Sequence, residues 1–415
     1  MPATPMPGPG TPGAAEPAPG RRLQSVDWVR GLVMALMLID HTRDFQHAES
    51  FWHRATDLSV ISSATFVTRW ITHFCAPLFV LLAGLGICFQ LQGGRSPAQV
   101  RRFLWTRGLW LLAAEFTLVT LGAEFQWAPW HHALLAQVIW VLGVSMLLMA
   151  FLVRLPRAWL LALGLVLVCG HNLLDPLQVP VWRGAGPAPG AWAALWTALH
   201  QVGLVAPFGA PYPRFFILYP VIPWPGVMAL GFALGGVYRL EPAQRRRTLA
   251  WLGAGCVAAF LALRPWNAYG DPAPWSFQAT PLRTVLSFVN TTKYPPSLLY
   301  LLMTLGPGLL LLAWRDGRAA NLLDRALITL GRVPMFFYLL QWPVAHGLAV
   351  LFHALAGKPW RSAVHLARPL PPQMGFSLAV VYLAWALGLV LLFPLCRWYA
   401  GFKQRHPKGW WWAYL

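Results

Sequence analysis

Long apolar runs, separated by short arginine clusters, recur along the whole chain and constrain its fold more than any other feature. Of the 415 residues, 57% are apolar and only 11% are charged, whereas ordinary soluble domains carry about 25% charged residues. About 20 consecutive apolar residues suffice to cross the hydrocarbon core of a bilayer as a helix. The sequence therefore predicts an all-α, polytopic transmembrane helical bundle.

Ten ranges have the length and composition expected of membrane spans. These ranges are 24–45, 64–90, 103–122, 133–153, 158–175, 214–238, 248–263, 295–314, 333–354 and 375–396. The sixth contains Pro220, Pro223 and Pro225. Because proline removes a backbone donor and clashes with the preceding turn, we expect this span to be broken or kinked.

The segments around the spans divide the chain into three predicted parts. Residues 1–20 are rich in Pro, Gly and Ala and are expected to form a disordered tail. Residues 21–400 are predicted to form a single integral-membrane domain. Residues 401–415 form a basic, aromatic tail.

The distribution of lysine and arginine predicts the orientation in the membrane. If the N-terminus is cytoplasmic, the inner segments hold 21 of the 32 basic residues, and the outer loop 122–132 has none. Loops rich in basic residues stay in the cytoplasm, so we expect both termini there, as an even number of spans requires. The net charge of +19 is spread over short clusters that suit anionic lipid headgroups, which argues against a nucleic-acid partner.

Two predicted outer loops, 176–213 and 264–294, are long and rich in Pro, Trp and Gly. Within the first, Ala191 to Val205 is expected to lie along the membrane interface, with Trp192 and Trp196 as aromatic anchors. Loops of this length in a compact bundle are often functional.

The first predicted span is interrupted by charge. Its apolar run extends only from Gly31 to Ile39, and nine residues of helix cover about 13 Å of a core roughly 30 Å thick. A helix that crosses here carries Asp27, Arg30, Asp40 and His41 near or within the bilayer. Such residues usually face a bundle interior or a water-filled cavity, so this helix is a candidate site.

Arg30 and His41 are eleven residues apart, or about 16 Å along a helix. Arginine suits a phosphate group, and histidine suits proton transfer at neutral pH. Asp40 or Asp44 is a candidate to orient the imidazole. The alternative is that Arg30 extends to the inner headgroups and His41 marks the outer interface.

The second predicted span carries Arg69 and His73 on one helix face, four residues apart. Pro77 leaves a backbone carbonyl one turn earlier without its helical donor, while Gly84 and Gly86 permit close helix approach. We regard His73 as a candidate catalytic residue. The alternative is an interfacial arginine beside a core histidine.

Glu115 is the only acid in the middle of its apolar span. An unpaired buried carboxylate is costly, so we expect it to face Arg69, His73 or His41. Its role is either structural or catalytic.

Four further arginines fall on the predicted inner side: Arg101, Arg102, Arg107 and Arg332. Each singly fits a contact with lipid headgroups. Together they suit a clamp on the phosphates of a nucleotide-like ligand.

The remaining histidines and the cysteines show no compelling metal-ligand motif. The outer histidines are His47, His53, His131, His132, His171, His200 and His365. A zinc or copper site among them is conceivable, but no pair has ligand spacing. The five cysteines lie in apolar stretches without a CxxC pair. We therefore expect no metal.

The segment SVDWVRGLVMALMLIDHTRD, with its Arg30-x10-His41 spacing, resembles the Arg-to-His signature of the transmembrane acyltransferase superfamily. The stretch from Leu23 to Phe89 resembles the heparan-α-glucosaminide N-acetyltransferase catalytic-domain family. The segments NTTKYPPSLLYLLMTLGP and GRVPMFFYLLQW resemble that family's bacterial branch, whose function is unassigned.

The resemblance implies that an acetyl or other acyl group moves from cytoplasmic acetyl-CoA to an outer acceptor, a glycan amine or hydroxyl or a lipid-linked sugar. Arg30 would then hold the CoA end and His41 would be the general base. Lysosomal-type members carry Asn at the step matching His41 and place their histidine later, where His47 and His53 lie here. His41, His47, His53 and His73 therefore all remain candidates for the catalytic histidine.

Two other functions fit the same polar residues. One is a transporter or flippase for a small anion or lipid-linked sugar, and the other is an assembly factor of an envelope complex. Few cysteines and Trp-rich outer loops suit a bacterial inner membrane. The oligomeric state is left open by the sequence.

Overall fold

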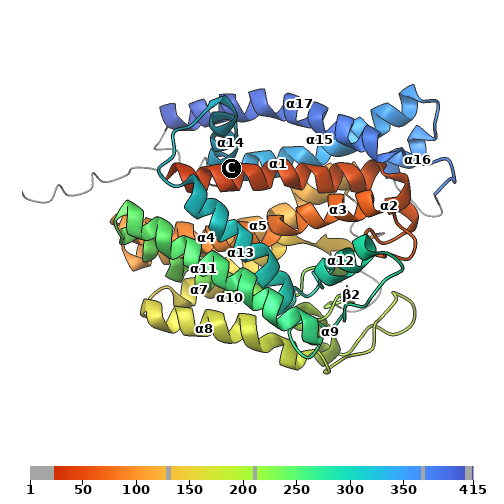
Figure 1. Ribbon diagram of the computed structural model, residues 1–415. Helices are drawn as coiled ribbons and strands as arrows, with labels where there is room; N and C mark the ends of the chain where they lie inside the picture. The colour runs from red at the N-terminus through yellow and green to blue at the C-terminus, as the bar shows by residue number, and fades with distance from the viewer. Residues whose placement is uncertain (1–22, 128–131, 209–212, 366–369, 407–413, 415) are drawn as a thin grey trace, which may run out of the picture.

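Nearly parallel helices form most of the molecule in the computed structural model (Figure 1). The structure describes residues 23–127, 132–208, 213–365, 370–406 and 414. The predicted tail 1–20 and most of the predicted tail 401–415 lie outside the described residues.

Ten main helices coincide with the ten predicted ranges. They are α1 (Gln24–Gln46), α4 (Cys75–Gln92), α5 (Pro97–Ala114), α7 (Val138–Leu152), α8 (Arg157–Gly170), α10 (Trp224–Leu234), α11 (Pro242–Leu263), α13 (Leu298–Arg315), α15 (Pro334–Leu355) and α17 (Leu378–Arg405). Six helical segments in the described chain are long and apolar enough to cross a membrane. The chain is thus an integral membrane protein, and the count of ten spans stays a prediction.

Shorter elements connect and extend these helices. The short α-helices are α2 (Ala48–Trp52), α3 (Ser63–Ile71), α6 (Thr120–Glu124), α9 (Ala191–His200), α12 (Pro281–Val289), α14 (Leu322–Arg332) and α16 (Trp360–His365). The remaining turns are η1 (Thr72–Phe74), η2 (Glu115–Val119), η3 (His171–Leu174), η4 (Val237–Arg239) and η5 (Arg264–Trp266). Of these, η2 is a π-helix and the others are 3₁₀ turns.

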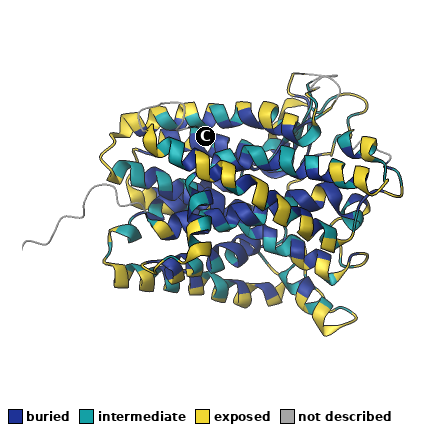
Figure 2. Cartoon of the chain, turned by 90° about the horizontal axis from the view of Figure 1, so that it is seen from above, coloured by how far each residue is buried: buried dark blue, intermediate teal, exposed yellow. Residues whose placement is uncertain are grey.

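Helix α1 lies inside the bundle, in contact with α4, α13, α14, α15 and α17. Seventeen of its 23 residues are buried, whereas α11 and α17 have few buried residues. Figure 2 shows the exposed residues on the outside of the bundle and the buried ones inside it. This position explains how a helix with so many charges is accommodated, because its polar side chains face protein groups rather than lipid.

Facing glycines bring α1 and α14 into close contact. A Cβ atom on Gly31 would lie 1.8 Å from the carbonyl oxygen of Leu327, and one on Gly331 would lie 1.8 Å from that of Asp27. Backbone approach of this kind needs residues without side chains. The crossing fixes the part of α1 that precedes its apolar run.

A small sheet corrects the all-α prediction. Strand β3 (Phe215–Ile217) lies between β1 (Leu134–Ala136), to which it is parallel, and β2 (Gly203–Val205), to which it is antiparallel. The fourth and sixth predicted spans therefore each begin with a strand. The predicted break in the sixth range is confirmed, since α10 begins only at Trp224.

The second predicted span is broken by η1, between α3 and α4. Pro77 leaves the carbonyl of His73 without its helical donor, and the hydroxyl of Tyr300 donates to that oxygen at 2.7 Å. Gly84 meets α10, because its Cβ would lie 1.9 Å from the carbonyl oxygen of Met228. The prediction of close approach at Gly86 is wrong, since nothing lies within 4 Å of a Cβ there.

The short elements α2, α9, α12 and α16 and the sheet gather at one end of the bundle, which we call the loop-rich end (Figure 1). The expected helix near residue 191 is present as α9. Trp192 is exposed, as an interfacial anchor should be, but Trp196 is buried and donates to the carbonyl of Leu177 at 2.8 Å. The anchor prediction for Trp196 is therefore wrong.

Candidate functional site

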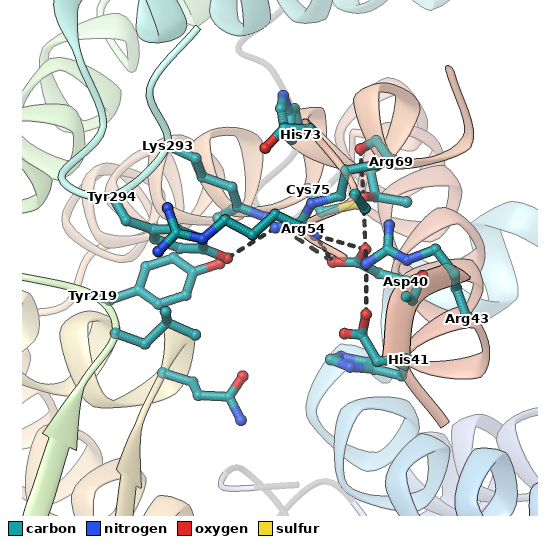
Figure 3. A pocket seen from close by; sticks show the side chains of 18 of the residues that line it. Asp40, His41, Arg43, Arg54, Arg69, His73, Cys75, Tyr219, Lys293 and Tyr294 are labelled. Carbon is teal, nitrogen blue, oxygen red and sulfur yellow. Dashed lines mark hydrogen bonds and ion pairs between the residues drawn. The ribbon is translucent and has the colours of Figure 1, made fainter. Parts of the chain in front are cut away.

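A cavity of about 870 Å³ opens at the loop-rich end, where α1 ends. Its walls come from α1, the segment after α1, η1, α4, the sheet and the segment before α13 (Figure 3). Among its polar lining residues are Asp40, His41, Arg43, Asp44, His53, Arg54, Arg69, Thr72, His73, Tyr219, Lys293 and Tyr294. The cavity has the size of a typical small-molecule site, about 300–1,000 Å³.

Asp40 is the centre of the charge cluster in this cavity. Arg69 donates to its two carboxylate oxygens at 2.6 and 2.5 Å, and Thr72 donates to Oδ1 at 2.9 Å. The guanidinium of Arg43 lies 2.8 Å from Oδ1, and Nζ of Lys293 lies 4.0 Å from Oδ2. These partners compensate the cost of burying a carboxylate.

Cations outnumber anions in the cavity wall. Four cationic side chains, Arg43, Arg54, Arg69 and Lys293, face two carboxylates, Asp40 and Asp44. Asp44 is more exposed than Asp40 and contacts Arg43 at 2.5 Å. The cavity is therefore electropositive, which favours an anionic ligand or a reaction in which negative charge develops.

His41 lies on the wall of this cavity and packs against Trp342 of α15, with the ring centroids 3.7 Å apart. Its Nδ1 atom is buried and has no hydrogen-bond partner among the described residues. The carboxylate of Asp40 contacts Arg69, Thr72 and Arg43, and that of Asp44 contacts Arg43. Neither carboxylate forms a hydrogen bond with the imidazole in the described residues, contrary to the prediction that one of them orients it.

His73 lines the same cavity from η1. The side chain is 1% exposed, and within the described chain neither ring nitrogen has a hydrogen-bond partner. Its backbone is fixed through the bond from Tyr300, so the ring position is set by the break that Pro77 makes. Two histidines with unpaired ring nitrogens thus line one electropositive cavity.

The other two candidate histidines differ in position. His53 lines the cavity and is exposed. His47 is buried, with Nδ1 at 3.2 Å from Oγ of Ser50, and is absent from the cavity wall. The geometry therefore favours His41, His73 and His53 over His47 as residues that contact a ligand.

Sequence reasoning missed Lys293, Tyr294 and Tyr219. Figure 3 shows these side chains across the cavity from His41 and Arg43. Arg69 donates to the hydroxyl of Tyr294 at 3.1 Å. Burial by itself raises the pKa of Tyr294, but the charges of Lys293 and Arg69 outweigh it and hold the pKa below its ordinary value.

One feature of the sequence could have pointed to this segment. All basic residues before position 293 are arginines, and Lys293 is the first lysine of the chain. A buried lysine is rare unless it is paired. This feature marks Lys293 as unusual. It does not indicate that Lys293 lies beside Asp40, which is 253 residues earlier in the sequence.

Asp271 holds the segment that presents Lys293. Its carboxylate accepts from the backbone N–H and the hydroxyl of Thr292 at 2.9 and 2.8 Å, and from the hydroxyl of Ser297 at 2.8 Å. Ser297 in turn caps α13 by accepting from the N–H of Tyr300 at 3.0 Å. The lysine is thus anchored on both sides to rigid structure.

Glu115 lies apart from this cluster. It is fully buried at the start of η2, and its Oε2 accepts from the backbone N–H of Trp140 at 2.8 Å. The expectation that it faces Arg69, His73 or His41 is wrong. The carboxylate instead caps the N-terminal end of α7, where unpaired backbone donors and the helix dipole favour an anion.

The predicted donor-binding arginines divide into two groups. Arg30 donates to the carboxylate of Asp27 at 3.2 Å and to the carbonyl of Gly331 at 3.3 Å, and Arg332 lies 3.9 Å from the same carboxylate. These two arginines therefore lie together where α1 crosses α14. This position is toward the opposite end of α1 from His41, and the cavity wall includes no residue of α1 before Met37.

The other three arginines project from α5, which packs on α7 rather than on α1. Arg101 and Arg102 are exposed. Arg107 packs over the rings of Trp110 and Tyr414. The structure does not bring this group to Arg30, so the five arginines do not form one clamp.

Comparison with known families adds one finding. The model of the family described as heparan-alpha-glucosaminide N-acetyltransferase, catalytic, matches residues 22–264. The matched region includes α1, η1, α4 and the sheet, and thus most of the cavity wall, but ends before Lys293. No curated protein matches the chain.

Proposed function

Because the chain belongs to the heparan-alpha-glucosaminide N-acetyltransferase catalytic family, we propose that it is an integral-membrane acyltransferase. It moves an acyl group, such as acetyl, from cytoplasmic acyl-CoA to an amine or hydroxyl of a glycan or lipid-linked sugar on the outer face. We place it in a bacterial inner membrane, with the loop-rich end outside.

One observation carries the proposal. His41 and His73, with unpaired ring nitrogens, lie in the same cavity as the Asp40 cluster at the end of a buried helix. A general base needs a free nitrogen that faces the acceptor, and a tetrahedral intermediate needs cations or donors near its oxyanion. The two histidines and the cations of the Asp40 cluster are the groups in this cavity that suit these two roles.

The residues suggest the following roles. The hydroxyl oxygen or neutral amine nitrogen of the acceptor attacks the carbonyl carbon of the thioester and forms a tetrahedral intermediate. His41 takes the proton that this oxygen or nitrogen loses. Lys293 and Arg69 stabilise the negative charge on the carbonyl oxygen. When that tetrahedral intermediate collapses, the carbon–sulfur bond breaks, and the leaving CoA thiolate takes the proton from the His41 imidazolium, which restores the base.

Asp40 acts in this scheme as a positioning residue. It holds Arg69, Arg43 and Lys293 together, which would otherwise repel one another. Arg30 and Arg332 support a donor site near the α1–α14 crossing, about 16 Å from His41 along the helix, a distance suited to an extended donor arm.

The test is acyl transfer by purified protein in proteoliposomes with radiolabelled acetyl-CoA and a panel of amino- and hydroxyl-bearing glycans. We expect His41→Ala to lower the rate by at least about 100-fold, as loss of a general base does, and His73→Ala to act more weakly. His365→Ala changes an exposed histidine outside the cavity and should keep the full rate. Full activity of the folded His41→Ala variant would refute the assignment of the base.

The electropositive cavity also suits a second function, the transport or flipping of an anion or lipid-linked sugar. This function predicts flux across proteoliposomes without any acyl donor. Strict dependence of product formation on acyl-CoA, with no flux in its absence, would exclude it.

A further inference from the structure

A second polar cluster lies outside the cavity, at the loop-rich end. His171 begins η3 directly after α8, Asp175 follows η3, and His200 is the last residue of α9. One ligand atom from each of the three lies within 4.8 Å of the others. None of the three lines the cavity.

Three of the four ring nitrogens in this cluster are buried and lack a hydrogen-bond partner among the described residues. His171 is 3% exposed and His200 is 2% exposed. In the described chain, neither nitrogen of His171 has a hydrogen-bond partner, and Nδ1 of His200 has none. Burying polar groups without partners is unfavourable, and a ligand that accepts nitrogen lone pairs would satisfy them.

The acid of the cluster is already directed toward the imidazoles. Oδ1 of Asp175 lies 3.1 Å from Nε2 of His200. Its other oxygen, Oδ2, accepts from the side-chain amide of Asn172 at 2.7 Å. Asn172 is itself fixed, because its Oδ1 accepts from the backbone N–H of Leu298 at 2.9 Å. Carboxylates that bind a metal are usually held by hydrogen bonds of this kind.

We propose that His171, Asp175 and His200 bind one divalent transition-metal ion of the zinc class. Two neutral imidazoles and one carboxylate suit Zn²⁺, whereas Mg²⁺ and Ca²⁺ prefer oxygen ligands. Ligand atoms bound to one zinc ion lie about 3.3 Å apart, so closure requires a local approach of about 1.5 Å at most. A water molecule completes the tetrahedron.

The ion connects elements that are far apart in the sequence. It ties the end of α8 to the end of α9, and residues 201–202 lead from α9 to β2, with Val202 in the cavity wall. The 28 residues between the two histidines match no ligand motif, so the sequence alone predicts no metal here. The ion stabilises the wall of the cavity without touching a ligand in it.

Direct metal binding by the purified full chain tests this proposal, independently of any transfer activity. The protein is stripped with a chelator, titrated with Zn²⁺ by calorimetry, and titrated with Co²⁺ while visible absorption is recorded. We expect one site per chain and the absorption of tetrahedral Co²⁺. His171→Ala and His200→Ala should each abolish the site, and Asn172→Ala should weaken it about 10–100-fold.

Two further variants protect the test against misfolding and surface binding. Asp175→Asn keeps the size of the side chain and should fold, yet bind Zn²⁺ at least about tenfold more weakly. His365→Ala should bind as the unchanged protein does. The proposal is overturned if the folded protein takes up no Zn²⁺, or if the His171, Asp175 and His200 variants all retain the same stoichiometry and affinity.

Discussion

At the scale of single residues, the decisive feature is the density of charge around Asp40. Three cationic side chains converge on one carboxylate that is mostly buried. The attraction between the carboxylate and the three cations stabilises this arrangement. Without the carboxylate, the cations would remain buried without a counter-ion. Asp40 therefore affects both the stability of this part of the protein and the electrostatic potential in the cavity.

Replacing Asp40 by Asn should expose this dependence. We expect Asp40→Asn to destabilise the protein by about 3–5 kcal/mol, as loss of one partner in a buried ion pair does, and to lower transfer activity. The measurement is thermal unfolding in detergent together with the transfer assay.

Asp44→Asn is the matched control. Its side chain is 52% exposed and, among the residues that the structure describes, forms an ion pair only with Arg43, so the expected loss is below about 1 kcal/mol. Equal destabilisation by the two substitutions would show that Asp40 does not hold the cluster together.

At the scale of elements, glycines set the distance between packed helices. Gly84 of α4 and Gly231 of α10 face each other, and a Cβ on Gly231 would lie 2.0 Å from the carbonyl oxygen of Leu81. A methyl group at such a place must push two backbones apart. Because α4 carries His73 on the turn before it, the spacing of α4 and α10 also affects the cavity.

Two glycines of one helix allow a clean comparison. Gly84→Ala should destabilise the protein by at least about 2 kcal/mol, because overpacking strains the interface. Gly86→Ala has open space around the new methyl group and should stabilise the helix by roughly 0.5–1 kcal/mol. Unfolding midpoints of both variants check this. The interpretation fails if the two changes have the same sign and size.

At the scale of the whole molecule, apolar run length predicted where helices form, and charge within the first run predicted that α1 is buried. Other features depend on contacts between distant segments. Lys293 reaches Asp40 across more than half of the chain, and the strands are three residues long, too short for a pattern of period two to be recognised. Glu115 was misplaced because burial alone does not say which donor a carboxylate meets.

Orientation in the membrane is a prediction at this same scale. Fusion of green fluorescent protein to either end should give fluorescence in a bacterial host, since we expect both ends in the cytoplasm. Fusion of alkaline phosphatase after Pro272, in the segment before α12, should give enzyme activity, because that enzyme folds only outside the cytoplasm. Phosphatase activity from a fusion at either terminus would contradict the proposed orientation.

The central position of α1 has a consequence for how the protein is made. Its neighbours α14, α15 and α17 come from residues 322 onward, and ribosomes add roughly 5–20 residues per second. After α1 leaves the ribosome, roughly 15–60 s pass before α14 is synthesised. During that time Asp27 and Arg30, which pair with each other within α1, lack their contacts with Arg332 and Gly331. The charged start of α1 therefore needs a polar or proteinaceous shelter at the insertion machinery until the last quarter of the chain arrives.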